Sequence, residues 1–422
     1  MFSRELLKNI ARFASGEALA RLCSIAVMIF LGHKYGVVIV GIYALAVSIS
    51  WYTVPLIDFG LRHIGARLIA QHPAYEPEIV RRIQRRRSLM AGTIIPLLAT
   101  YSICARLPLR LKIFVLVFSV SSTLYATSLD WVAWGKEHLQ LVGGVRALIP
   151  FSILVAVCTA QAKGETVLWW AAAGNLAGYI LQAVVFRLWW RRQHLHSTTG
   201  ESPVPAMIAD SLAWRTTIVM GIAWFAQIAF NSIDTLMLGV VSGPEQVGLY
   251  SSAYRILMQV LVTYYLIILA LYPSLSRLSP ERRLALLRPR VLIALFAIGT
   301  TIAMAVSLLR RELLVIVFGR SFLPAAILIL VLAWAIPLDF VTSYLNNAYI
   351  AWGMERKLLR CIVVAAGTNI ILNIIFLPKY GAMAAAVNTI IAYFVYLAGL
   401  NLVRRAMQLE MRGRTTLLQE SK

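Results

Sequence analysis

Long apolar runs recur along the whole chain, and they constrain its fold more than any other feature. The run at 216–241 is typical, because at about 1.5 Å per residue it is long enough to cross a bilayer. The runs are continuous rather than alternating, which favours helices over a β-barrel. The sequence therefore predicts an all-α polytopic membrane protein with about twelve transmembrane helices. We place these spans at 10–31, 38–59, 88–105, 113–133, 147–162, 166–186, 216–241, 249–275, 291–309, 322–352, 361–377 and 382–403.

The chain is strongly basic, with a formal net charge of +22. Such a charge can indicate nucleic-acid binding, so the position of the basic residues matters. Most of the 40 Lys and Arg residues lie at the two termini and in the even-numbered loops between the predicted spans. This asymmetry is the positive-inside rule and predicts that both termini are cytoplasmic. The charge thus reflects membrane topology, and we expect no nucleic-acid partner.

Two short patterns occur twice, about half the chain apart. A Leu-Gly pair followed nine residues later by Gly-x-Tyr lies at 31–43 and again at 238–250. Ala-Trp-Gly occurs at 133–135 and at 351–353, in the same order. Repeated patterns at one large offset indicate an internal duplication.

A flexible Ser/Gly/Pro stretch at 197–205 separates the two predicted halves. We therefore predict an N-terminal six-helix lobe at 1–190, a cytoplasmic linker at 191–214 and a C-terminal six-helix lobe with a cytoplasmic tail at 215–422. Because six is even, the two lobes have the same orientation. Parallel repeats of this kind place a central cavity between them.

The span at 216–241 carries polar residues that membrane helices normally exclude. Asn231 and Asp234 are three apart and lie on one helix face. A charge at membrane depth costs roughly 2.5–3.5 kcal/mol, so both should face a protein interior or a hydrated cavity. Arg255 lies at matching depth on the next span, which predicts an ion pair with Asp234. The pair is either a permanent structural contact or a gate that the substrate opens.

Other polar residues within spans suggest cavity lining. Asp339 follows Pro337, where a helix kink is expected. Glu17 and Arg21 form an i, i+4 pair in the favourable order, either for structure or as part of the cavity. Asp58 and Asp130 fall at predicted span ends and are interpreted as interfacial. The amides interpreted as interhelical hydrogen-bonding groups are Asn175, Gln182, Asn369, Asn373 and Asn388.

Catalytic and metal-binding patterns are not found in the sequence. The six histidines lie in loops or at span ends, and the four cysteines show no ligand spacing. A phosphate-binding loop is missing as well. We therefore predict a protein that is not an enzyme and has no catalytic residues, cofactor or metal; a buried charge set of this kind points to transport.

Several motifs in chain order resemble bacterial polysaccharide flippases of the Wzx type, within the multidrug/oligosaccharidyl-lipid/polysaccharide exporter superfamily. They are Asn-x-x-Asp-x-Leu-Met-Leu-Gly at 231–239, Gly-Leu-Tyr at 248–250, Ala-Tyr-Arg at 253–255, Asp-Phe-Gly-Leu at 58–61 and Ala-Trp-Gly at 351–353. The resemblance covers essentially the whole chain.

The resemblance implies an alternating-access carrier in the bacterial inner membrane. Its substrate would be an undecaprenyl-diphosphate-linked oligosaccharide, destined for a surface polysaccharide such as the O-antigen of lipopolysaccharide. Arg21 and Arg255 would bind the diphosphate, and Asn231 and Asp339 would complete the substrate site. Glu17, Asp234 and Arg255 would form gating ion pairs. Membrane lipids, a polysaccharide polymerase and chain-length proteins are the other expected partners.

Two alternatives remain. A multidrug or cation exporter of the same superfamily would bind cations, and Asp234 and Asp339 are compatible with that role. A membrane-embedded glycan polymerase or transferase fits less well, because the outer loops are short and catalytic residues are missing from the sequence.

Overall fold

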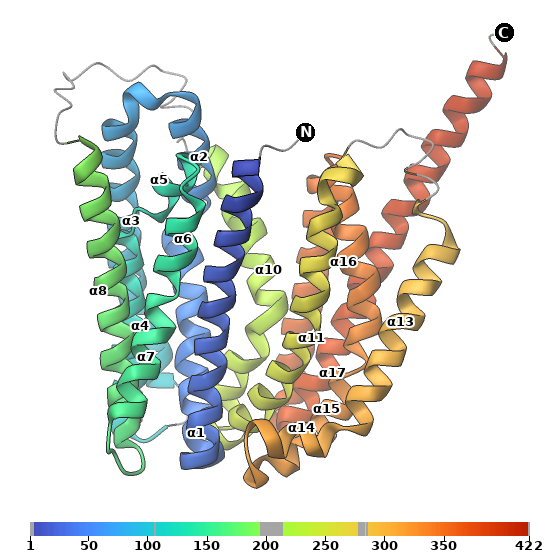
Figure 1. The fold of residues 1–422 in the computed structure, drawn as a ribbon. Helices are drawn as coiled ribbons and strands as arrows, with labels where there is room; N and C mark the ends of the chain where they lie inside the picture. Colours follow the sequence, from blue (N-terminus) through green and yellow to red (C-terminus); the bar gives the residue numbers. More distant parts are fainter. Residues whose placement is uncertain (1–3, 105–106, 195–213, 277–282, 284–285, 421–422) are drawn as a thin grey trace. The chain divides into compact units, whose positions relative to one another are not determined.

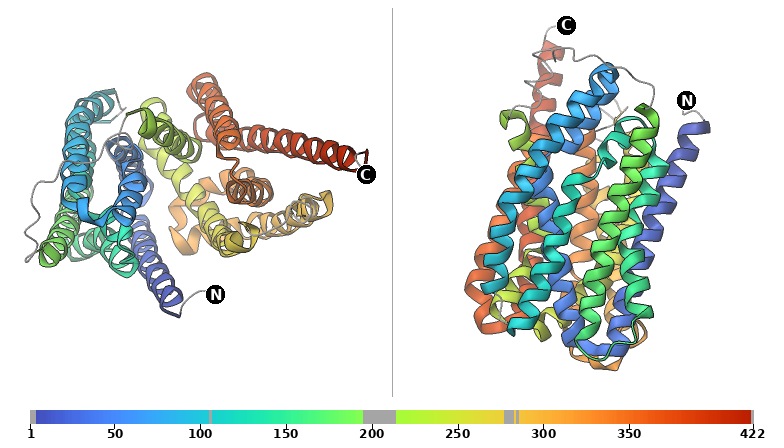
Figure 2. Two further views of the ribbon diagram at one scale, coloured as in Figure 1. Left: turned by 90° about the horizontal axis from the view of Figure 1, so that it is seen from above. Right: turned by 90° about the vertical axis from the view of Figure 1, so that its left-hand side faces the viewer.

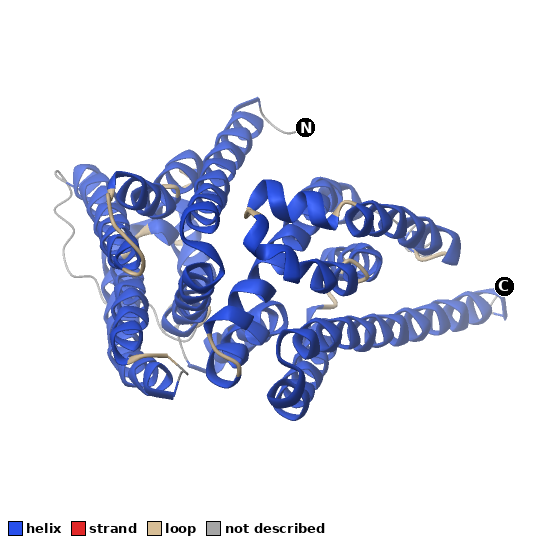
Figure 3. Ribbon diagram, turned by 90° about the horizontal axis from the view of Figure 1, so that it is seen from below, coloured by secondary structure: helices blue, strands red, loops and turns tan. Residues whose placement is uncertain are grey.

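The computed structural model describes residues 4–104, 107–194, 214–276, 283 and 286–420, and these residues form helices and short connections without a strand (Figure 3). The all-α fold class is confirmed. Packing divides the chain into two compact units, Met1–Ile228 and Ala229–Lys422. This division lies within a helix, beyond the predicted linker at 191–214, most of which is outside the described residues.

Unit 1 begins with α1 (Arg4–Asp58), a helix long enough to cross a membrane twice. Gly36 breaks it with a φ of 78°, and the second limb runs back beside the first (Figure 1). The remaining elements of the unit are α2 (Leu61–Gln71), η1 (Pro73–Tyr75), α3 (Glu76–Cys104), α4 (Leu109–Ser121), η2 (Ser122–Thr127), α5 (Asp130–Gly135), α6 (Leu139–Arg146), α7 (Leu148–Thr159) and α8 (Thr166–His194).

Unit 2 begins within α10 (Trp214–Val241), whose first part up to Ile228 belongs to unit 1, and it ends in α17 (Glu355–Glu420), which Gly381 breaks with a φ of 51°. The second limb of α17 is long and straight (Figure 2). Between these helices lie α11 (Pro244–Ser276), α13 (Pro289–Leu308), α14 (Arg310–Val317), η3 (Arg320–Ala325), α15 (Ala326–Leu332) and α16 (Ala335–Ala351).

The number of membrane spans agrees with the expected twelve in outline. Eight helices among the described residues are long and apolar enough to cross a membrane, or up to nine if a bent pair is one span. That count treats α1 and α17 as single helices, although each is broken into two limbs, and it omits α11. With the bent pair counted as one span, the two broken helices and α11 account for the difference.

The duplicated pattern marks equivalent turns in the two units. Gly36 lies four residues after Gly32, and Gly243 lies four residues after Gly239. Their φ angles are 78° and 85°, a left-handed conformation that favours glycine. The same turn at the same place in both repeats supports the predicted internal duplication.

The predicted kink near Pro337 is confirmed. The segments Arg320–Leu332 and Ala335–Ala351 meet at a bend of 50°. Pro337 is the third residue of α16, and its missing N–H cannot bond to a carbonyl one turn earlier. Gly299 on α13 packs against this point, since a Cβ there would lie 2.6 Å from the Pro337 Cα.

A compact apolar core closes one end of unit 1. It is centred on Trp131, which is fully buried among residues of α2, α3, α5, α6 and α8. Gly65 on α2 allows this approach, because a Cβ there would meet Trp131 and Ile83 at 2.6 Å. The core fixes the short helices α2 and α5, which carry charged residues of the site described next.

Candidate functional site

Unit 2 holds a buried polar group that we name the Asp234 cluster: Asp234, Tyr250, Asn369, Asn373, Asn388 and Thr389. Asp234 lies on α10 between the buried residues Phe230 and Leu238, at the four-residue spacing that keeps all three on one face. Its side chain therefore points into the protein, and the residue is 1% exposed.

Three neutral side chains hold the Asp234 carboxylate. Asn373 Nδ2 donates to Oδ1 at 2.5 Å, Tyr250 donates its hydroxyl to Oδ2 at 3.0 Å, and Thr389 Oγ1 donates to Oδ2 at 3.2 Å. Because these donors come from α11 and both limbs of α17, the carboxylate connects three separate helices.

The amides around this carboxylate form a second layer. Asn373 Nδ2 also donates to Asn369 Oδ1 at 3.0 Å, and Asn388 Nδ2 donates to Asn373 Oδ1 at 2.9 Å. The break at Gly381 folds the two limbs of α17 together and makes these contacts possible. The predicted hydrogen bonding of the three asparagines is confirmed, but their connection to Asp234 was missed by sequence reasoning.

The expected ion pair between Asp234 and Arg255 is not among the ion pairs of the described residues. Tyr250 occupies the face of α11 that meets Asp234. Arg255 is five residues further on, about 140° around the helix, and lies half-buried. In this conformation a hydrogen-bond network replaces the pair, and pairing in another transport state stays a prediction.

This arrangement can exchange a proton or a small cation. A buried carboxylate held by neutral donors can accept a proton, and its oxygen-rich neighbours are the ligand type that hard cations take. Groups of three or more His, Cys, Asp or Glu that could hold a metal ion do not occur in the described part of the chain. The side chains that donate to the Asp234 carboxylate are all neutral.

Asp339 lies on a separate polar stripe of α16. Asp339, Ser343 and Asn346 are spaced at i, i+4 and i+7 and are all half-buried. Ser343 donates to Asp339 Oδ2 at 3.1 Å, and Tyr396 of α17 donates to Asn346 Oδ1 at 2.9 Å. Asn231 is also half-buried, on α10. Substrate binding by Asp339 and Asn231 stays a prediction.

Unit 1 holds a different arrangement, the N-terminal ion network: Glu17, Arg21, Asp58, Arg62, Arg87, Asp130 and Arg146. At its centre Arg87 Nη2 lies 2.5 Å from Asp58 Oδ1, and both side chains are fully buried. Arg87 also donates to the Ser128 carbonyl at 3.0 Å and stacks over Tyr125, 4.8 Å from the ring centroid. This arginine joins α1, α3 and the segment before α5.

Asp130 lies between further arginines. Arg62 Nη2 is 3.3 Å and Arg146 Nη2 is 3.8 Å from its Oδ2. Burial acts to raise the pKa of Asp130, but Arg62, Arg87 and Arg146 outweigh it and hold this pKa below its ordinary value. Asp130 is therefore a fixed negative charge.

The network ends at Glu17 and Arg21, whose side chains are only partly buried. Arg146 Nη1 lies 3.8 Å from Glu17 Oε2, and Arg21 Nη2 lies 3.3 Å from Glu17 Oε1. The side chains of Arg21 and Glu17 are 43% and 32% exposed. The predicted i, i+4 pair thus forms, at the accessible end of a buried network.

Asp58 and Asp130 lie at or just beyond the ends of candidate spans, as expected, but both are 0% exposed within the protein, which sequence reasoning did not predict. Asp58 accepts the Arg62 backbone N–H at 3.2 Å and so stabilises the turn at Gly60, whose φ is 83°. The sequence does contain a signal that Arg87 is buried, because Arg87 continues the buried stripe of Ile79 and Ile83 at four-residue spacing. An arginine on an apolar stripe implies a buried acid opposite.

Buried charges and amides inside a helical membrane protein are typical of a transporter. The chain belongs to the family described as polysaccharide biosynthesis protein, whose sequence model matches residues 6–279. This range includes the N-terminal ion network, Asp234 and Arg255, and it ends before the asparagines of α17.

Two curated relatives match part of the chain. The inner membrane protein YghQ of Escherichia coli strain K12 is 31% identical over 167 residues, which are 38% of this chain and 42% of that protein. The probable low-salt glycan biosynthesis flippase Agl15 of Haloferax volcanii is 22% identical over 174 residues, 39% of this chain and 36% of that protein. The matches thus span less than half the length of these relatives.

Among solved structures, the lipid II flippase MurJ in an inward closed conformation has a similar fold. The TM-score is 0.71 at 13% identity, and the match covers 93% of this chain and 87% of MurJ. A likeness at this identity shows the fold and confirms the fold class. Family, fold and apolar helices together place the chain among multi-pass membrane proteins of the polysaccharide biosynthesis protein family.

Proposed function

We propose that this protein is an alternating-access flippase for an undecaprenyl-diphosphate-linked oligosaccharide. It would move repeat units across the bacterial inner membrane for synthesis of a surface polysaccharide, of which O-antigen is one example. The observation that carries the proposal is membership of the polysaccharide biosynthesis protein family over residues 6–279. A polymerase and chain-length proteins would then use the delivered repeat unit.

The diphosphate requires cations along a hydrated path through the membrane. Arg21 is suited to this role because its pair with Glu17 is partly exposed and so contributes little stability. An arriving diphosphate can replace Glu17 as the partner of Arg21. Arg255 on α11 is the second residue proposed for diphosphate binding, and Asn231 and Asp339 would contact the polar glycan.

The Asp234 cluster supplies a site whose charge can change during transport. Loss or gain of a proton or monovalent cation at Asp234 alters the contacts that connect α10, α11 and α17. A ligand shifts a conformational equilibrium only by its differential affinity for the two states. We therefore assign Asp234 to coupling and the arginines to substrate binding.

The test is a flipping assay in proteoliposomes with a fluorescent polyprenyl-diphosphate oligosaccharide. An impermeant reagent that destroys the label outside the vesicle reports transfer between leaflets. We expect transfer with the wild-type chain and about tenfold slower transfer with Arg21→Gln or Arg255→Gln, at unchanged protein level. Arg192→Gln, on an exposed residue outside these sites, is the matched control.

A multidrug exporter gives the opposite result. It would show no lipid transfer but would move an organic cation, with loss of that activity in Asp339→Asn. Equal lipid transfer with and without the protein would overturn the flippase proposal.

A further inference from the structure

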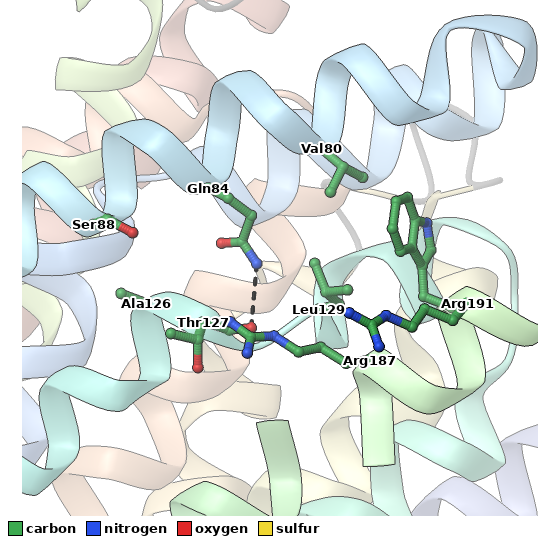
Figure 4. A pocket seen from close by; sticks show the side chains of 9 residues that line it. Val80, Gln84, Ser88, Ala126, Thr127, Leu129, Arg187 and Arg191 are labelled. Carbon is green, nitrogen blue, oxygen red and sulfur yellow. Dashed lines mark hydrogen bonds between the residues drawn. The ribbon is translucent and has the colours of Figure 1, made fainter. Parts of the chain in front are cut away.

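Unit 1 has a pocket of about 230 Å³ on its flank, separate from the ion network (Figure 4). Its walls are α3 and α8, and residues 126–129 of η2 and the following turn form its floor. Both walls pack against α4 and η2. The polar lining residues that matter for the argument are Gln84, Thr127, Arg187 and Arg191, with Trp190 beside them.

The pocket carries positive charge without a counter-charge. Arg187 and Arg191 are one turn apart on α8, and both extend toward the floor (Figure 4). Its lining includes no acid, and among the described residues neither arginine has an ion pair. Glu76, which accepts from Trp190 at 2.9 Å, is paired with Lys136 at 2.7 Å. Two unneutralised guanidinium groups in one concave site are suited to a phosphate.

An unsatisfied acceptor lies in the same pocket. Gln84 Nε2 donates to the carbonyls of Thr127 and Ser128, both at 3.3 Å, which fixes the orientation of the amide. Gln84 Oε1 is then buried without a hydrogen-bond partner. A buried acceptor left unpaired costs free energy, so a ligand that brings a donor is favoured there. A phosphate alone does not satisfy Gln84, whereas a phosphate ester with a hydroxyl group does.

An apolar track leads from the pocket toward the middle of the membrane spans. Ile113 and Val117 of α4 are 46% and 42% exposed, and Val120 and Leu124 are half-buried. Ile113, Val117 and Val120 follow the spacing i, i+4 and i+7, which is one face of α4, and Leu124 lies in η2 between this face and the pocket residue Thr127. A ligand with a polar head in the pocket can lay an acyl chain along this face.

We propose that this pocket binds the headgroup of an anionic glycerophospholipid whose phosphate diester carries free hydroxyl groups, as phosphatidylglycerol does. The phosphate contacts Arg187 and Arg191, a headgroup hydroxyl donates to Gln84 Oε1, and one acyl chain follows the α4 face. A headgroup ammonium is disfavoured, because it would lie beside two arginines. The adjacent Trp190 fits the headgroup level, where tryptophan is enriched.

The test measures binding of short-chain phosphatidylglycerol to the purified full-length chain in detergent by native mass spectrometry. We expect Arg187→Gln/Arg191→Gln to bind about tenfold more weakly. The exposed neighbour Arg192 provides the matched control, and Arg192→Gln should bind as the wild type does. Gln84→Met should abolish the preference for phosphatidylglycerol over phosphatidic acid, which has no headgroup hydroxyl beyond its phosphate.

Three results would overturn the assignment. Undiminished binding by the double variant places the lipid elsewhere. Equal binding of phosphatidylethanolamine would show that Arg187 and Arg191 do not select an anionic headgroup. Displacement of the lipid by glycerol phosphate at equal concentration indicates a site for soluble phosphate esters. Because Arg187 and Arg191 are exposed, the melting temperature of each variant should match that of the wild type. If the double variant is less stable, the single variants Arg187→Gln and Arg191→Gln provide the same binding test.

Discussion

Both units bury carboxylates inside a membrane protein, but they stabilise these charges with different partners. In unit 1 the central acids Asp58 and Asp130 each meet arginines, and the network has alternating charges up to the exposed Arg21. In unit 2 Asp234 meets Asn373, a tyrosine and a threonine, all neutral. One arrangement fixes its charges, and the other leaves a carboxylate whose charge can change.

The difference indicates that the two buried charge sites have different roles. A buried ion pair is costly to break, because removing one partner leaves an uncompensated charge. Such a pair suits a part of the protein that holds its shape. A carboxylate held only by neutral donors loses much less on protonation. The comparison therefore assigns stability to the N-terminal ion network and responsiveness to the Asp234 cluster.

The largest effect is expected from exchanging the charges of unit 2 with Asp234→Arg and Arg255→Asp. The donors of Asn373, Tyr250 and Thr389 would then face a guanidinium that accepts no hydrogen bond. We expect no folded protein in the membrane fraction. If the double variant folds whereas each single variant does not, Asp234 and Arg255 form an ion pair, and unit 2 neutralises its buried charge as unit 1 does.

Arg87→Met should destabilise unit 1 by about 3–5 kcal/mol, because Asp58 is then buried without its partner. Thermal denaturation followed by size-exclusion chromatography measures the loss. Arg85→Met, on an exposed residue of the same helix, should leave the melting temperature unchanged. An Arg87→Met protein as stable as the control would remove the structural role of the network.

Asp234→Asn should separate folding from transport. The loss of charge-assisted hydrogen bonds is offset by removal of a buried charge, so we expect a change in stability below about 1 kcal/mol. Transfer of the lipid-linked oligosaccharide should stop, because the amide cannot change charge. Asp58→Asn is the matched comparison and should lose about 3 kcal/mol, since Arg87 is left unpaired. Normal transfer by Asp234→Asn would remove the coupling role.

Arg146→Gln should have the smallest effect. Its contacts to Asp130 and Glu17 are 3.8 Å long and its side chain is 28% exposed, so the expected loss at neutral pH is below about 1 kcal/mol.

The pH dependence of this variant is more informative. Ionised Asp130 stabilises the fold above its unfolded pKa, and this stability is lost as the pH falls through its lowered folded pKa. Removing Arg146 raises that folded pKa, so the melting temperature should begin to fall at a higher pH than in the wild type. Identical acid profiles would show that Arg146 does not act on Asp130.

The sequence by itself determined the fold class, the membrane spans and the duplicated turns. Continuous apolar runs leave helices as the solution in a bilayer, and the turns at Gly36 and Gly243 require a residue that tolerates a positive φ. The kink before Pro337 follows from local chemistry in the same way. These features depend on single segments or on regular spacing, which a sequence displays directly.

Only the tertiary structure decided which side chains meet. Periodicity places Asp234 on a buried face, but it does not say that α17 folds back at Gly381 and presents Asn373 and Thr389 there. Matching depth suggested Arg255 as the partner, whereas the rotation of α11 turned Tyr250 toward the carboxylate. Depth and spacing are properties of one helix. The partner of a buried charge depends on the rotation and contact of neighbouring helices, which packing of the whole unit sets.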